Sequence, residues 1–186
     1  MSEVKNILAE ASTQMKKALE HLEAELSKIR TGKASPVMLE GVKVDYYGTP
    51  TPLSQVANIT ATDAKTLTIQ AWEKNLIPVI EKAIRDANLG FNPTSDGSLI
   101  RILIPTLTEE RRKELVKQAK QTGEDAKVAV RNVRRDYNEK LKKLTKNGVP
   151  EDEVRAGETE MQKQTDNFIT QIDNHLKQKE AEIMKV

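Results

Sequence analysis

The residues that break helices are gathered in the middle of this chain, and their distribution limits the fold more than any other feature. Of the seven prolines, six lie between Thr31 and Pro105, together with five of the eight glycines. The flanking segments, residues 1–30 and 106–186, contain few helix breakers and are rich in Lys, Glu and Gln. Such a switch indicates two domains, one inserted into the other. We therefore expect a helical domain built from both flanks and an inserted domain of residues 31–105.

Both flanks repeat apolar residues at steps of three and four, the spacing of an amphipathic helix. In the first flank the apolar stripe covers residues 4–29, with Ser2 placed to cap its start and Gly32 to end it. The second flank predicts one helix over residues 108–146 and another that begins at Pro150. Each helix has a single narrow apolar stripe and needs partners, so we expect a three-helix bundle.

The inserted segment alternates apolar and polar residues in three short runs, as half-buried strands do. These runs are residues 42–46, 66–71 and 100–104. The Gly-Thr-Pro-Thr-Pro segment at 48–52 is expected to be a turn, and Pro78 opens a short helix that ends before Gly90. Ser95-Asp96-Gly97 is expected to be a hairpin turn before the last strand. The predicted fold class is therefore α+β: a long three-helix bundle with a small β/α/β domain inserted between its first and second helices.

The chain passes between the two domains twice. Two short parallel connections restrict translation of one domain and permit its reorientation, so we expect a two-stranded hinge. The alternative is a rigid elbow, stiffened by the prolines at positions 36 and 105. The expected hinge residues are Arg30, Thr31, Gly32, Lys33, Ile104, Pro105, Thr106 and Leu107.

The sequence gives little support for an enzyme. Cysteine is absent, which excludes a disulfide framework and a thiolate nucleophile. The two histidines, His21 and His175, lack the spacing of metal ligands. No phosphate-binding loop, dinucleotide-binding glycine motif or nucleophile elbow occurs. We expect no catalytic residue, no cofactor and no metal.

The sequence also lacks the usual signs of a membrane or exported protein. No apolar run approaches the ~20 residues of a membrane helix. The N-terminal residues carry acids and show no targeting pattern. We therefore expect a cytoplasmic protein without a membrane partner. We also expect it to act as a monomer.

The net charge of +2 conceals opposite charges on the two later helices. Residues 111–146 hold thirteen basic and five acidic residues, whereas residues 151–186 hold five basic and nine acidic ones. At about 100° per residue, several cations of the earlier helix should form a ridge opposite its apolar stripe. This ridge would consist of Lys113, Lys120, Lys127, Arg131 and Arg135, with Arg134 on its flank.

A cationic ridge with almost no aromatic residues suits the phosphates of folded RNA, which proteins recognise largely by shape and backbone contacts. Two alternatives are an ordinary solvated helix face and neutralisation of the ridge by the acidic last helix. An adaptor or chaperone that binds proteins through an exposed bundle face is the alternative function. Such a protein would have an apolar groove, and its binding would not depend on salt.

Five stretches of the sequence, in order and from end to end, resemble the ribosome recycling factor family. They are KIRTGKASP (28–36), VDYYGTPTPL (44–53), NLGFNPTSDGSLIRI (88–102), LTEERRKEL (107–115) and VAVRNVRRDYN (128–138). The resemblance implies an L-shaped translation factor that binds the post-termination ribosome. With elongation factor G and GTP, such a factor promotes disassembly of the ribosome into subunits. It has no catalytic activity of its own, because elongation factor G hydrolyses the nucleotide.

The resemblance also implies that the bundle contacts large-subunit rRNA. The residues carried over by motif are Arg112 of EERR and Arg131, Arg134 and Arg135 of VRNVRR, and Lys127 joins them from the ridge. Arg30 of the KIRTG motif is a further candidate. Lys33 stands where many relatives have arginine, which keeps the charge and loses the planar fork.

Overall fold

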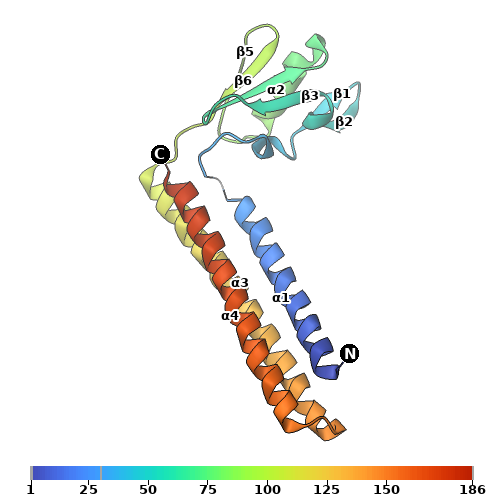
Figure 1. Ribbon diagram of the computed structural model, residues 1–186. Coiled ribbons are helices and arrows are strands. Elements are labelled where there is room, and N and C mark those ends of the chain that lie inside the picture. The colour runs from blue at the N-terminus through green and yellow to red at the C-terminus, as the bar shows by residue number, and fades with distance from the viewer. Residues whose placement is uncertain (1, 30, 186) are drawn as a thin grey trace. The chain divides into compact units, whose positions relative to one another are not determined.

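The computed structural model describes residues 2–29 and 31–185, and the chain forms two compact units. One unit is built from residues 1–31 and 109–186, and the other from residues 32–108. Figure 1 shows long helices in the first unit and strands with one helix in the second. The α+β class, with long helices and a small sheet domain, is confirmed.

The first unit is a bundle of three helices, α1 (Glu3–Ser27), α3 (Glu109–Lys143) and α4 (Glu151–Met184). Each helix packs against the other two. The apolar stripes expected from the sequence form the core, in which Met15, Leu141 and Met161 are completely buried. Because the stripes are narrow, the three helices depend on one another for stability.

Of the two predicted ends of α1, the structure confirms the first and moves the second. Ser2 Oγ accepts a hydrogen bond from the Lys5 amide at 3.4 Å, which confirms the predicted N-cap. The helix was expected to continue to Gly32, but it ends at Ser27. Gly32 lies beyond it with a left-handed φ of +80°. The segment between them includes the β-branched Ile29, which favours a helix weakly.

The second unit contains a four-stranded antiparallel sheet in the order β3-β4-β6-β5 and a separate two-stranded hairpin, β1–β2. The strands are β1 (Lys43–Tyr46), β2 (Thr49–Pro52), β3 (Ala57–Ala61), β4 (Thr66–Ala71), β5 (Pro93–Ser95) and β6 (Leu99–Leu103). The helix α2 (Ile77–Asp86) contributes Ile80 and Ile84 to one core with Leu67 and Ile100 of the sheet.

The second unit has more strands than the sequence pattern predicted. The segment 48–52, expected as a turn, is mostly strand β2, and only Tyr47 and Gly48 turn the chain. Prolines are tolerated in β2 because this strand pairs on one side only. Strand β3 was missed because alanine and asparagine are weak strand formers. The predicted hairpin turn at residues 95–97 connects β5 to β6 as expected, although β5 itself, with only three residues, shows no alternating pattern.

Candidate nucleic-acid interface

Part of the expected cationic ridge is paired with α4 and does not face away from the bundle. Lys127 Nζ lies 2.7 Å from Asp173 Oδ1 and 3.5 Å from Glu124 Oε1, and only 15% of its side chain is exposed. Lys120 Nζ lies 3.4 Å from Glu180 Oε1. The expectation that the whole ridge faces away from the core is therefore wrong.

The reason is that α3 has two neighbours. Both α1 and α4 pack against it, so the buried arc of α3 is wider than its apolar stripe alone suggests. The flank of the ridge reaches the acidic α4, and the opposite charges meet there. The hydrogen bond from Lys127 to Asp173 raises the pKa of this lysine, which holds its proton firmly at neutral pH.

Three arginines in the second half of α3 are placed differently, and we call Arg131, Arg134 and Arg135 the arginine cluster. Arg131 and Arg135 are exposed, and Arg134 is half-buried. Arg134 Nη1 donates to Gln162 Oε1 at 3.1 Å, and Arg135 Nη2 donates to Asn132 Oδ1 at 3.2 Å. Within residues 2–29 and 31–185, no carboxylate forms an ion pair with the cluster.

The partners of the cluster are therefore neutral amides, which orient a guanidinium group without cancelling its charge. This differs from the more N-terminal cations of the same helix, such as Lys113, which lies 3.7 Å from Glu109. An uncancelled guanidinium group can form two parallel hydrogen bonds with a phosphate. Gln162 of α4 had not been expected at this site, because sequence separation hides which residues of antiparallel helices meet.

Arg112 lies apart from the cluster. It is 19 residues before Arg131 on the same helix, or about 28 Å along the axis. Its side chain is half-buried, and its Nε atom is buried without a hydrogen-bond partner in the described part of the chain. Arg112 falls one turn before the buried Leu115, on the packed side of the helix. Its guanidinium group is therefore less accessible than that of Arg131.

The expected hinge residues lie at the crossings between the units, except that Arg30 falls outside the described residues. A side chain on Gly32 would contact Leu107 at 3.4 Å, so the two crossing segments are adjacent. Both segments are also tied to the turn between β3 and β4. The Ala34 amide donates to the Ala64 carbonyl at 2.9 Å, and the Ile104 amide donates to the Lys65 carbonyl at 2.7 Å.

The same turn is stabilised by a side chain. Asp63 Oδ1 accepts a hydrogen bond from the Lys65 amide at 2.8 Å, and this bond lowers the pKa of Asp63. The crossing segments thus start and end on a hydrogen-bonded anchor within the second unit. Lys33, Pro105 and Thr106 lie outside these contacts and are exposed.

Neither histidine lies in a cluster of candidate metal ligands within the described part of the chain. His21 is exposed, and His175 Nε2 lies 3.1 Å from Glu23 Oε1 across α1 and α4. Among the residues that the structure describes, no group of three or more His, Asp or Glu side chains could hold a metal ion. The helices in residues 2–29 and 31–185 include no candidate membrane-spanning segment.

The family model for ribosome recycling factor matches residues 22–184 of this chain. The chain belongs to the ribosome recycling factor family. It is 55% identical over 184 residues to the ribosome-recycling factor of Flavobacterium psychrophilum, covering 99% of this chain and 98% of that one. It is 52% identical over 185 residues to the factor of Nitratidesulfovibrio vulgaris, covering 99% of this chain and all of the other.

Solved structures of ribosome recycling factors have the same fold. The solution structure of one factor aligns with all of this chain at a TM-score of 0.75 and 42% identity. A second structure gives models for the T. thermophilus ribosome recycling factor and the E. coli elongation factor G bound to the E. coli post-termination complex. Its recycling factor aligns with 99% of this chain at a TM-score of 0.63 and 47% identity.

Proposed function

We propose that this protein binds the post-termination ribosome and, with elongation factor G and GTP, promotes its disassembly into subunits. The observation that carries this proposal is its similarity, over almost its whole length, to ribosome recycling factors. A recycling factor that is 47% identical has been described on a post-termination complex together with elongation factor G. The protein acts in the cytoplasm, as a monomer and without catalytic activity of its own, while elongation factor G hydrolyses GTP.

The bundle is the part that binds large-subunit rRNA in this proposal, and the arginine cluster supplies its main contact. Support comes from the exposure of Arg131 and Arg135 and from the absence of a carboxylate paired with the cluster in the described residues. Arg134 adds a guanidinium group held in place by Gln162. Arg112 is a second, more distant contact. Lys127, with its side chain turned to Asp173, acts mainly by holding α4 against α3.

The two crossings act as the hinge, so that the second unit reorients when elongation factor G engages it. The anchors at Ala64 and Lys65 favour this arrangement because they fix the crossing segments to one turn of the second unit. Rotation is then confined to the short stretch around Thr31 and Lys33 on one segment and Pro105 and Thr106 on the other.

Arginine substitutions test the rRNA contact. We expect R131A/R134A to weaken binding to large ribosomal subunits several-fold. The slope of log affinity against log salt should also fall by about one for each phosphate that the variant no longer binds. Sedimentation with large subunits at several salt concentrations measures both quantities. R155A/K163A is the matched control, because it removes two cations from the exposed side of α4.

Two results would count against this assignment. Unchanged affinity and unchanged salt slope in R131A/R134A would exclude the arginine cluster from the interface. Binding of the unsubstituted protein that does not depend on salt would favour the adaptor or chaperone function instead.

The complete reaction is tested by subunit splitting. Post-termination complexes are incubated with this protein, with and without elongation factor G and GTP, and the released subunits are measured by light scattering. We expect splitting only when all three are present. Splitting that is independent of this protein would contradict the proposed function.

A further inference from the structure

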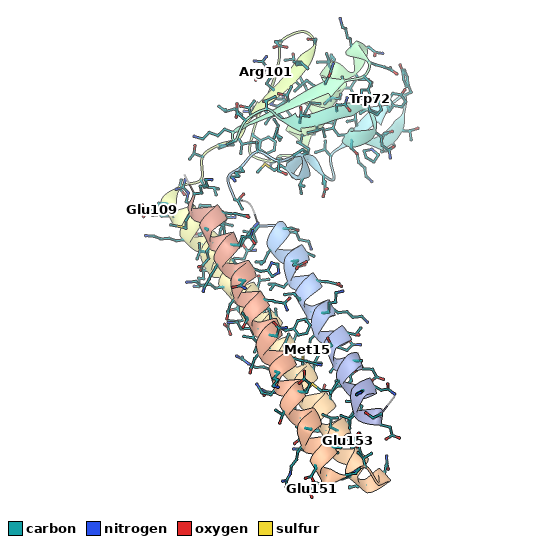
Figure 2. The ribbon with its side chains drawn as sticks, in the orientation of Figure 1. Met15, Trp72, Arg101, Glu109, Glu151 and Glu153 are labelled. Atoms are coloured by element: carbon teal, nitrogen blue, oxygen red, sulfur yellow. The ribbon has the colours of Figure 1, made fainter. Side chains whose placement is uncertain are left out.

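The second unit contains a pocket that the proposed rRNA contact does not use. It has a volume of about 370 Å³ and lies where β1 and β2 meet the segment that follows β4. Tyr46, Trp72 and Leu76 form its apolar walls, and Glu73 contributes a carboxylate. Figure 2 labels Trp72, whose side chain lies at the surface of this unit and is 61% exposed.

Two tyrosines hold the carboxylate of Glu73 in place. The Tyr46 hydroxyl donates to Glu73 Oε1 at 3.0 Å, and the Tyr47 hydroxyl donates to Glu73 Oε2 at 3.0 Å. The two rings meet edge to face, with centroids 4.7 Å apart. Asn75 Nδ2 donates to the Tyr47 hydroxyl at 3.4 Å and extends the network.

The backbone is strained to place the second tyrosine. Tyr47 and Gly48 form the two-residue turn between β1 and β2, and both have positive φ, +49° and +84°. This turn usually has asparagine or aspartate where Tyr47 stands, because other side chains fit the left-handed region poorly. Strained residues of this kind are often found at binding sites. Here the strained residue is one that orients Glu73.

The negative charge of Glu73 is not cancelled within the described part of the chain. Glu73 forms no ion pair there, whereas Glu81 of α2 lies 3.4 Å from Arg85 Nη2. The tyrosine hydroxyls are neutral donors, and each carboxylate oxygen can accept a further hydrogen bond. The charge acts on its neighbour, since the hydrogen bond from Tyr46 to Glu73 raises the pKa of the Tyr46 phenol.

A carboxylate beside an exposed indole ring is suited to a cation. The indole face attracts a cation through its π electrons, and the carboxylate accepts charge-assisted hydrogen bonds from the same group. Arginine fits better than lysine because its planar guanidinium group can stack on Trp72 while donating to Glu73. Thr51 and Gln55 also line the pocket and offer additional acceptor oxygens.

We propose that this pocket binds an arginine side chain presented by a protein partner. Its volume fits one long side chain, and its carboxylate would repel the phosphates of a nucleic acid. Glu73 and Trp72 touch the guanidinium group, and Tyr46 and Tyr47 position Glu73. The pocket thus recognises a protein with chemistry opposite to that of the arginine cluster on α3.

The single tryptophan of the chain makes the test direct. Because Trp72 is the only tryptophan, emission excited selectively from tryptophan in the full-length protein reports on this pocket, without the signal of the three tyrosines. The probe is N-acetyl-arginine amide, titrated in parallel with the lysine and citrulline analogues. We expect a saturable change in emission with arginine, weaker binding of lysine, and at least about tenfold weaker binding of citrulline, which has the same shape without the charge.

Variants of the pocket extend the test. E73Q should weaken binding of N-acetyl-arginine amide about tenfold. D86N, an equal charge change on an exposed residue outside the pocket, should bind like the unsubstituted protein. Q55E adds a carboxylate at an exposed lining position and should tighten binding several-fold. Q55E gives an independent answer if E73Q disturbs the hairpin.

Two outcomes would overturn the proposal. One is an equal response to arginine and citrulline, which would show that the charge is not recognised. The other is unchanged arginine affinity in both E73Q and Q55E. No ribosome is present in this assay, so its result does not depend on the proposed role in recycling.

Discussion

Gly123 lies on the packed side of α3, where a side chain would collide with Leu176 of α4. A Cβ atom built on Gly123 would lie 2.8 Å from Leu176 Cγ and closer still to both of its methyl groups. Alanine normally stabilises a helix relative to glycine by about 1 kcal/mol. Here we predict that G123A lowers the free energy of unfolding by about 1–3 kcal/mol, because Leu176 must leave its packed position to make room for the added methyl group. Urea denaturation followed by far-ultraviolet circular dichroism measures the change.

A second substitution isolates the cause. In an L176A background the added methyl group has room, so G123A should become neutral or stabilising there. Equal effects of G123A in both backgrounds would show that the close approach to Leu176 does not limit stability.

At the scale of residues, local patterns were predictable and long-range contacts were not. The apolar stripe of α1 and its Ser2 cap follow from the sequence, because both depend on neighbours within a few turns. Gly123 is different, since a glycine interrupts the apolar stripe of a helix when the sequence is considered alone. Its position between Ala119 and Ala126, at steps of four and three, is the signal that identifies it as part of the packed face. The bond from Tyr46 to Glu73 spans 27 residues and has no local signal.

At the scale of elements, long helices were easier to predict than short strands. A stripe repeated over many turns gives a strong signal, whereas β5 has only three residues. The predicted direction of the cationic ridge was wrong because it also depended on contacts that one helix cannot show. A helical projection shows how far a residue lies from the apolar stripe but not how many helices surround it. Lys127 pairs with Asp173 because a second neighbouring helix, α4, packs against the side of α3 on which Lys127 lies.

The Lys127–Asp173 pair gives a prediction for the α3–α4 interface. The hydrogen bond to Asp173 raises the pKa of Lys127, so the folded state binds this proton more tightly than the unfolded state. The resulting stabilisation is complete below the unfolded lysine pKa of about 10.4 and is lost as pH rises through the higher folded-state pKa. We predict that K127M costs about 1 kcal/mol near neutral pH, and that this difference shrinks in the alkaline range.

Urea denaturation of K127M and the unsubstituted protein at neutral and alkaline pH checks this prediction. K120M is the control, because Lys120 is 65% exposed and its pair with Glu180 should contribute less than about 0.5 kcal/mol. A difference between K127M and the unsubstituted protein that grows with rising pH would contradict the assigned sign.

At the scale of the whole molecule, each unit buries its own apolar residues. The core around Leu67 and Ile100 lies within the second unit, and the core around Met15 and Met161 lies within the bundle. The switch in composition along the chain has a physical cause here, because prolines and glycines serve strands and turns while the flanks form helices. Neither core needs residues from the other unit, so each can be tested alone.

The last prediction removes the second unit and asks what the bundle does without it. Gly32 and Leu107 lie side by side, so a short Gly-Ser linker in place of residues 33–106 can join the two parts of the bundle. We expect this variant to keep the helical circular dichroism of α1, α3 and α4. It should also bind large ribosomal subunits with an unchanged salt slope, since the arginine cluster is intact, but fail to split post-termination complexes with elongation factor G and GTP.

Adding R131A/R134A to this variant should weaken its binding as in the full-length protein. A folded bundle that no longer binds would place the main ribosome contact in the second unit, whereas a bundle that still splits ribosomes would show that reorientation at the hinge is unnecessary.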